Sequence, residues 1–252
     1  MTGSGRACCA RNVIWTKAAD KRLIQLYERG LVWGAIAKQL SAEFESTVSV
    51  KAVDSRLFVL KEMGSLGSWL DTAAIGFLDI ETSNFDANAG FMISWAMLVP
   101  KTKKLSQDLI TSKEITKGFG DDSRIVGSLV EALKTVDVVS TFWGTGFDVP
   151  FVRARAMWHK APFPAYGSIS HLDLFYASRR LLKMSRRSLH VVTAFLGIEG
   201  KTHLDLSVWN KARVGHGPSL QYVMDHNIAD VEILALLFDR VRPYAKWIRK
   251  SI

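Results

Sequence analysis

An apolar run that ends in two closely spaced acids, residues 76–83 (GFLDIETS), constrains the fold of this chain more than any other stretch. Alternate side chains of a β-strand point to opposite faces, so Asp79 and Glu81 are predicted to lie on one face of a strand. Neighbouring acids at the end of a buried strand repel each other unless a cation lies between them, and carboxylates suit hard cations such as Mg²⁺. A strand that runs into a solvated acidic turn explains the same pattern, so the choice depends on partners elsewhere in the chain.

The composition describes a folded protein with an excess of positive charge. The 252 residues are 48% hydrophobic and 23% charged, and the formal net charge is +9. A chain of this length forms one domain, or a small domain beside a larger one. The positive charge favours a polyanionic partner, with nucleic acid as the first candidate, although a basic protein that is merely soluble has the same balance.

The two cysteines, Cys8 and Cys9, are adjacent in an N-terminal segment, residues 1–12, that we expect to be disordered. They are too few for a disulfide framework or a cysteine zinc site, which is typical of a reducing compartment. No apolar stretch is as long as a membrane span, and residues 1–12 lack the apolar block of a signal peptide. We therefore expect a cytoplasmic location and no membrane partner.

Residues 13–63 have the pattern of three short helices joined by tight turns, with Thr16 and Ser49 as predicted N-caps and Gly30 as a helix end. This stretch resembles a Myb/SANT-like helix-turn-helix domain. In that resemblance the third helix lies in the DNA major groove, with three residues exposed to DNA: Lys51, Ser55 and Arg56. Three-helix units of this kind also bind proteins, so the sequence leaves both partners open.

Glycine and serine in residues 64–70 predict a linker, after which residues 71–252 alternate between strands and helices. Strands are predicted at residues 75–80, 91–99, 103–111, 136–142 and 169–172. An amphipathic helix is predicted after the cap residues Asp121, Asp122 and Ser123. An opening meander followed by strand–helix pairs predicts an α/β fold with a mixed β-sheet flanked by helices.

A second acid stands in residues 142–151 (FWGTGFDVPF). A strand ends there, two glycines allow the backbone to turn, and Asp148 stands where a helix starts, with Pro150 in the first turn. An Asp at this position usually serves as the helix N-cap. A role in a site requires the carboxylate to point elsewhere, and the sequence leaves both alternatives open.

Residues 220–240 are the last strong helical signal, and His226 and Asp230 stand four residues apart within it. That spacing places both side chains on one helix face. A lone pair of this kind usually lies on the surface and stabilises the helix, so it indicates a site only in combination with the other acids.

Five cations stand within nine residues after the predicted strand at residues 169–172: Arg179, Arg180, Lys183, Arg186 and Arg187. Such a run is either a solvated helix face or, beside a nuclease site, a surface that binds phosphates. The sequence favours neither reading.

The strings FLDIETSNF, GTGFDVPF and HNIADV, in this order, resemble the three motifs of the DEDD 3′–5′ exonuclease superfamily, over residues 73–240. The resemblance is to the DnaQ-like branch that contains polymerase proofreading domains and phage relatives, and it implies a ribonuclease H-like fold. It also implies two Mg²⁺ or Mn²⁺ ions, which activate a water molecule and stabilise the leaving oxygen. The four metal ligands are then Asp79, Glu81, Asp148 and Asp230.

The resemblance also implies individual roles. Asp79 bridges the two ions, Glu81 and Asp230 bind the metal of the nucleophile, and Asp148 holds the other metal mainly through water. His226 orients or deprotonates the attacking water.

This chain departs from the family pattern at two places. His226 precedes the last Asp by four residues, which is the spacing of the family's tyrosine subgroup with the chemistry of its histidine subgroup, so its role as the base is less secure. The usual Asn upstream of the second acid is absent, and Trp143 or Phe147 could stack on a terminal base there, although a core role for both is the commoner one.

The resulting prediction is a metal-dependent 3′–5′ exonuclease that releases nucleoside monophosphates, with DNA favoured over RNA and a replication or repair protein as a possible partner. Two alternatives stay open. One is a non-catalytic DNA-binding or regulatory protein on a nuclease scaffold. The other is a ribonuclease that uses the same site.

Overall fold

A computed structural model of the chain describes residues 15–62, 69–117, 120–200, 205–245 and 250–252. The chain divides into two compact units, Met1–Ala73 and Ala74–Ile252. The predicted disordered segment, residues 1–12, and most of the predicted linker lie outside the described residues.

The smaller unit contains four helices within its described part: α1 (Lys17–Glu28), α2 (Trp33–Glu43), α3 (Val50–Glu62) and the short α4 (Trp69–Thr72). The Thr16 and Ser49 hydroxyls accept from the Ala19 and Ala52 N–H groups, both at 3.1 Å, as the sequence predicts for N-caps. Gly30 ends the first helix with a φ of 78°. The buried apolar faces of the first three helices form a separate core that includes Leu23, Leu26, Ile36, Leu40, Val53 and Leu57.

The larger unit is built on a mixed sheet with the strand order β3-β2-β1-β4-β5-β6. Its strands are β1 (Ile75–Thr82), β2 (Met92–Val99), β3 (Lys104–Leu109), β4 (Val138–Thr141), β5 (Ser170–Asp173) and β6 (Lys250–Ser251). The first three form an antiparallel meander, β4 and β5 run parallel to β1, and β6 is antiparallel to β5. The predicted α/β fold with a mixed sheet is confirmed.

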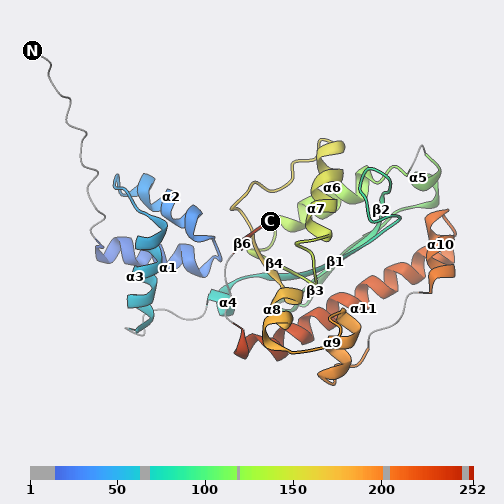
Figure 1. Ribbon diagram of the computed structural model, residues 1–252. Helices are drawn as coiled ribbons and strands as arrows, with labels where there is room; N and C mark the ends of the chain where they lie inside the picture. Colours follow the sequence, from blue (N-terminus) through green and yellow to red (C-terminus); the bar gives the residue numbers. More distant parts are fainter. Residues whose placement is uncertain (1–14, 63–68, 118–119, 201–204, 246–249) are drawn as a thin grey trace, which may run out of the picture. The chain divides into compact units, whose positions relative to one another are not determined.

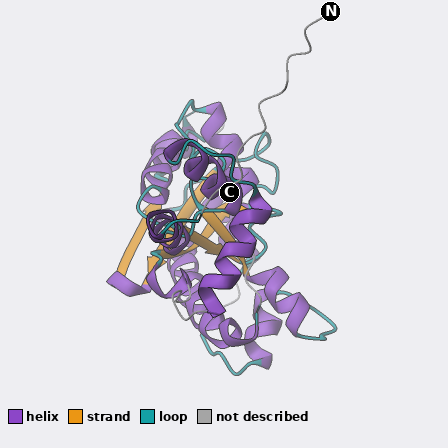
Figure 2. Cartoon of the chain, turned by 90° about the vertical axis from the view of Figure 1, so that its left-hand side faces the viewer, coloured by secondary structure: helices purple, strands orange, loops and turns teal. Residues whose placement is uncertain are grey.

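Helices cover both faces of this sheet (Figures 1 and 2). The helix α11 (Gly217–Val241) packs on β1 and β2 from one side, whereas α6 (Ser123–Leu133) and α7 (Asp148–Trp158) lie on the other (Figure 1). The remaining helices are α5 (Ser112–Thr116), α8 (Leu174–Leu181), α9 (Leu189–Phe195) and α10 (Leu206–Arg213), with 3₁₀ turns at Pro100–Thr102 and Arg242–Tyr244. None of the helices in the described ranges is long and apolar enough to cross a membrane.

The predicted strands are present, but three of the five are shorter than predicted, and β6 was not foreseen because its two residues carry no pattern. Asp122, one of the three predicted cap residues, stands at the N-cap position of α6. Its carboxylate makes no capping bond at α6. It accepts instead from the Met92 N–H at 2.8 Å and from the guanidinium of Arg155 on α7.

Candidate active site

The two acids of β1 lie on the strand face that α11 covers. Phe77, two residues before Asp79, places its ring 5.5 Å from that of Phe238 on α11. Because side chains alternate along a strand, Asp79 and Glu81 project to the same face as Phe77. The intervening Leu78 and Ile80 are buried on the opposite face, in the core that includes α6 and α7. The strand thus presents its carboxylates to α11, as the spacing predicts.

The pairing of β1 with β2 becomes irregular directly after Glu81. Glu81 pairs with Ser94, but Thr82 pairs with Met92, so β2 contains one extra residue at this point. Such bulges bend a strand and redirect side chains, and they are frequent beside active sites. The Ser83 N–H donates to the Phe91 carbonyl at 2.9 Å, and this bond closes the loop that follows.

The buried side chains of His226 and Asp230 meet Glu81 from α11. The His226 Nε2 lies 3.8 Å from Glu81 Oε1 and 3.8 Å from Asp230 Oδ2. His226 is 8% exposed and Asp230 is 5% exposed. The structure therefore brings one imidazole between two carboxylates that are far apart in the sequence, which removes the reading of His226 and Asp230 as a surface pair.

Asp148 reaches β1 from α7, and not from α11. It is the first residue of α7, and the N-cap position belongs to Phe147, so the carboxylate does not act as a helix cap. Beyond Phe77 the pairing of β1 with β4 ends, and the Ile80 N–H donates to the Asp148 carboxylate. The pKa of Asp148 is raised to about 7, mainly because burial penalises the charged form and also because Asp173 carries negative charge.

The turn that leads to Asp148 has an unexpected construction. The residue with a left-handed backbone is Trp143, with a φ of 67°, and not one of the two glycines. The glycines are required by close approach, since a Cβ on Gly144 would lie 2.2 Å from Thr141 Oγ1 and one on Gly146 would lie 2.7 Å from the Trp143 ring. The prediction that glycine lets the backbone turn here is corrected accordingly.

Aromatic side chains lie beside this turn. The ring of Phe147 is 5.7 Å from Phe151 and 5.8 Å from Phe85, which belongs to the loop after β1. Phe147 is partly buried against the core, whereas Phe85 is 79% exposed. Phe85 was not among the predicted site residues, because an isolated loop aromatic carries no signal of its own.

The sequence comparison identifies the larger unit. The pattern of the RNase H superfamily matches residues 76–242, which is more than half of the chain. The chain belongs to the RNase H superfamily. The predicted ribonuclease H-like fold is thereby confirmed.

This RNase H superfamily member is also similar to parts of two archaeal polymerases. A DNA polymerase of Methanocaldococcus jannaschii is 30% identical over 102 residues, which cover 31% of this chain and 6% of the polymerase. The structure of the family B DNA polymerase from Pyrobaculum calidifontis is similar with a TM-score of 0.55 and 17% identity, over 67% of this chain and 24% of the polymerase. The chain spans a small part of either protein, and the second likeness concerns the fold alone.

The basic residues predicted to bind nucleic acid are exposed, with one exception. Arg179 and Arg180 stand in the last turn of α8, and Lys183, Arg186 and Arg187 follow it. In the smaller unit Lys51 and Ser55 are exposed on α3. Arg56 differs, because its guanidinium binds the Asp20 carboxylate through two nitrogens at 2.6 and 2.7 Å.

The acids of this RNase H superfamily member suit divalent cations by their chemistry. Buried or half-buried carboxylates from β1, α7 and α11 supply oxygen ligands, which Mg²⁺ and Mn²⁺ prefer. A cation would also offset the burial that raises the pKa of Asp148. Among the described residues no three His, Cys, Asp or Glu side chains are already grouped as ligands of one ion. The donor set therefore fits such ions.

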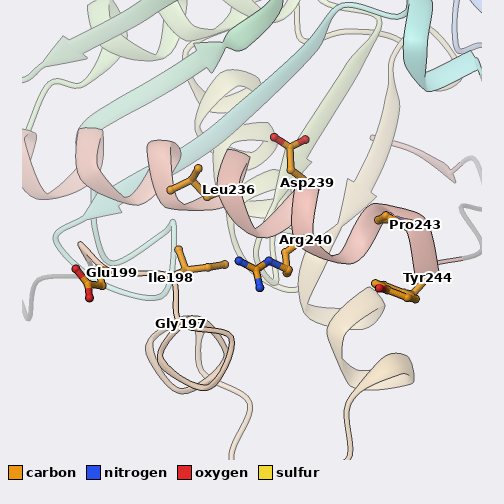
Figure 3. A pocket seen from close by; sticks show the side chains of 8 residues that line it. All are labelled: Gly197, Ile198, Glu199, Leu236, Asp239, Arg240, Pro243 and Tyr244. Carbon is orange, nitrogen blue, oxygen red and sulfur yellow. The ribbon is translucent and has the colours of Figure 1, made fainter.

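A separate cavity lies beyond Asp230, at the C-terminal end of α11 (Figure 3). Its volume is about 700 Å³, and it is lined by the loop after α9, the last turns of α11 and the 3₁₀ turn that follows. None of the predicted site residues contributes to it. The acids and this cavity are therefore distinct features of the RNase H unit.

The buried Asp148 carboxyl predicts a particular pH dependence of stability without metal. The ordinary Asp pKa is 3.8 and that of Asp148 is raised to about 7, so between these values the folded chain binds more protons than the unfolded chain. The contribution of the Asp148 carboxyl to the stability of the folded chain is therefore complete below pH 4, and it is lost as the pH rises through about 7. Asp148→Asn, which stays neutral, will flatten this slope and stabilise the metal-free protein above pH 7 by up to about 4 kcal/mol.

Urea unfolding followed by circular dichroism in EDTA, between pH 5 and 8, measures this effect. Asp225→Asn is the matched control, because Asp225 is exposed on α11, where it accepts from the Gln221 side chain. Equal slopes for Asp148→Asn and the unmodified chain would contradict the expectation.

Proposed function

We propose that this chain is a two-metal-ion 3′–5′ exonuclease of the DEDD type, which hydrolyses phosphodiester bonds and releases nucleoside monophosphates, with DNA as the preferred substrate. The observation that carries the proposal is the meeting of Glu81, His226 and Asp230 at the face of β1 that also presents Asp79. Asp148 reaches the same strand through the Ile80 N–H. Membership of the RNase H superfamily and the likeness to DNA polymerases support a nuclease.

The carboxylates have the role of metal ligands in this proposal. Asp79, Glu81, Asp148 and Asp230 would hold two Mg²⁺ or Mn²⁺ ions, which when bound lower the pKa of water and stabilise the negative charge of the leaving oxygen. The His226 Nε2 would accept the proton of the attacking water, since it already lies within 3.8 Å of two of the proposed ligands. Its burial between α11 and β1 keeps the imidazole in one place.

We propose that α3 of the smaller unit contributes to DNA binding through the exposed Lys51 and Ser55, as a helix-turn-helix would. Arg56 has a structural role in this proposal and does not contact DNA. Its bidentate pair with Asp20 connects α3 to α1, so it fixes the orientation of α3 while the other two residues face solvent. A replication or repair protein is the proposed assembly partner, in keeping with the polymerase relatives.

The cations after α8 supply a test of phosphate binding. Each phosphate contact to a single strand contributes about 0.7 to the slope of log K against log salt. Replacing Arg186 and Arg187 together by Gln should therefore reduce that slope by about 1.4 and weaken binding at 50 mM KCl by about tenfold. Fluorescence anisotropy with a labelled single-stranded oligonucleotide, from 50 to 200 mM KCl, measures both quantities.

The matched control for this pair is Lys104→Gln with Lys113→Gln, two exposed lysines on β3 and α5. It removes the same charge from a different part of the larger unit. Equal losses in both double variants would mean that net charge alone governs binding, and that the run after α8 has no special part.

The proposed activity is tested with oligonucleotides labelled at either end, in Mg²⁺, in Mn²⁺ and in EDTA. A 3′–5′ exonuclease produces a ladder from 5′-labelled DNA and free mononucleotides from 3′-labelled DNA, and only with metal. The same assay with RNA decides between deoxyribonuclease and ribonuclease activity. If neither substrate is cut and calorimetry detects no divalent-ion binding, the chain is a binding protein on a nuclease scaffold.

A further inference from the structure

Trp143 has a backbone conformation that a bulky residue rarely adopts. Its φ of 67° lies in the left-handed region, where side chains other than those of Gly, Asn and Asp are uncommon. Such a conformation costs on the order of 1 kcal/mol and persists only where the surroundings impose it, most often at functional sites. Trp143 is also 46% exposed, so burial of the indole does not explain why the residue stands here.

Hydrogen bonds to both sides of the Trp143 backbone impose this conformation. The Asp173 carboxylate accepts from the Trp143 N–H through Oδ1 and from the Thr145 N–H through Oδ2, both at 2.9 Å. The Trp143 carbonyl accepts from the Gly146 and Phe147 N–H groups at 2.9 and 3.2 Å. Asp173 also caps α8 through the Phe175 N–H at 3.1 Å, so its carboxylate is fixed at the end of β5.

The indole itself rests on the turn. A Cβ on Gly146 would lie 2.7 Å from the indole Cε2 and 2.8 Å from Nε1, so the ring lies directly against the Gly146 backbone. Gly146 is two residues from Asp148. The arrangement places a supported and partly exposed aromatic surface on the short turn that delivers an acid to the site.

Other aromatic residues nearby are placed differently. Phe147 lies between Phe85 and Phe151 and is partly buried against the core. Phe142 and Phe175 contact each other edge to face, 5.7 Å apart. None of these phenylalanines has a positive φ. Trp143 is therefore the aromatic residue of this turn whose backbone conformation costs free energy although its side chain stays 46% exposed.

We propose that Trp143 stacks on a nucleobase at the 3′ end of the substrate and that Asp173 is its positioning residue. The inference rests on the proposed nuclease function and extends it to a base-binding surface. Stacking on an aromatic side chain accepts any base, because every base has a π-face. The surface would therefore hold the end of a strand without reading its sequence, which suits an enzyme that removes successive nucleotides.

The test measures binding of a single-stranded oligonucleotide with 2-aminopurine at its 3′ end, in Ca²⁺ in place of Mg²⁺. Trp143→Asn tolerates a left-handed backbone and lacks the ring, so Kd should rise about tenfold and the quenching of 2-aminopurine should be lost. Trp143→Phe restores an aromatic ring and should bind within about threefold of the unmodified chain. Gly146→Ala keeps Trp143 but collides with its ring, and should weaken binding as Trp143→Asn does.

Asp173→Asn distinguishes a positioning role from a merely structural one. The amide oxygen can replace one of the two carboxylate oxygens, but the amide nitrogen is a donor and cannot accept in place of the other. If Asp173 acts through Trp143, Asp173→Asn will weaken binding, and the double variant with Trp143→Asn will be no weaker than Trp143→Asn alone. Additive losses, or unchanged Kd and quenching in Trp143→Asn, would overturn the inference.

The outcomes separate this inference from the proposed function. Thermal unfolding of each variant confirms that the larger unit is folded before binding is compared. If the unmodified chain cuts DNA while Trp143→Asn binds it equally well, the base-binding role fails and the nuclease stands. If the unmodified chain neither binds nor cuts any oligonucleotide, both fail together.

Discussion

Replacing Asp79 by Asn will reduce metal-dependent hydrolysis by at least about 10³-fold, which corresponds to about 4 kcal/mol of transition-state stabilisation. The reason is the position of Asp79 on β1, on the strand face that presents Glu81 to His226 and Asp230. An amide has nearly the volume of a carboxylate but no charge, so the ligand is weakened while the packing of the strand is preserved. Initial rates of mononucleotide release, measured over a range of Mg²⁺ concentrations, give the effect.

Glu232→Gln is the control for Asp79→Asn. Glu232 stands on α11 two residues after Asp230 and is exposed, because two residues along a helix turn the side chain by about 200°. Glu232→Gln removes one negative charge from α11, which carries site residues, but the side chain at 232 does not face the site. The rate of mononucleotide release by this variant should stay within about twofold of that of the unmodified chain. A rate for Asp79→Asn that equals that of Glu232→Gln would refute the proposed catalytic site.

Asp79→Asn should at the same time leave the fold unaffected or slightly more stable. Clustered carboxylates repel one another when no cation is bound, and removing one charge relieves that repulsion. A variant that is inactive and well folded, with unchanged circular dichroism, would therefore separate the loss of chemistry from a loss of structure.

Much of the arrangement of the candidate site was predictable because its acids stand on regular elements. A period of two along β1 places Asp79 and Glu81 on one face, and the four-residue spacing on a helix places His226 beside Asp230. Both periodicities are local properties of the chain. The order of the three motifs then indicates that the elements meet, which the 3.8 Å distances from His226 show for Glu81 and Asp230.

The construction of the turn before Asp148 was not predictable from local patterns. Two glycines predict a flexible turn, yet the strained residue is Trp143, held by Asp173 from 30 residues later in the chain. Asp173 follows a predicted strand, and because β5 is the parallel neighbour of β4, its carboxylate meets the residues after Thr141. Knowledge of the strand order would have been needed to find this pair, since sequence spacing alone does not contain it.

Asp122 shows the same limit in a different setting. An Asp before an amphipathic helix is usually a cap, and the sequence supports that reading. Asp122 is instead 0% exposed, and its carboxylate accepts from Arg155 and from the Met92 N–H. The His159 Nε2 lies 2.6 Å from Asp122 Oδ1. Its partners come from β2 and α7, and no local pattern distinguishes this use of an Asp from a cap.

The buried ion pair of Asp122 and Arg155 leads to the largest expected change in stability. Arg155→Met will lower the free energy of unfolding of the larger unit by about 3–5 kcal/mol, because it leaves the Asp122 charge buried without its main partner. Arg155 also donates to the Ala87 carbonyl at 3.1 Å, so the loop between β1 and β2 loses a contact as well. Urea unfolding at pH 7, followed by circular dichroism, measures the loss.

The exposed pair of Lys134 and Glu131 provides the contrast. Lys134→Met breaks an ion pair of the same charge type on the surface of the same unit, and it should cost less than about 1 kcal/mol. Similar losses for Lys134→Met and Arg155→Met would mean that burial does not govern the effect.

A double variant separates the cost of the unpaired charge from the value of the pair. Asp122→Asn keeps an acceptor for the Met92 N–H but removes the buried charge. Combined with Arg155→Met, it should be more stable than Arg155→Met alone by about 1–3 kcal/mol, because desolvation of an uncompensated carboxylate is the main penalty. If the double variant is instead less stable than Arg155→Met, the geometry of the hydrogen bonds matters more than the charge, and Asp122 serves chiefly to orient β2 against α7.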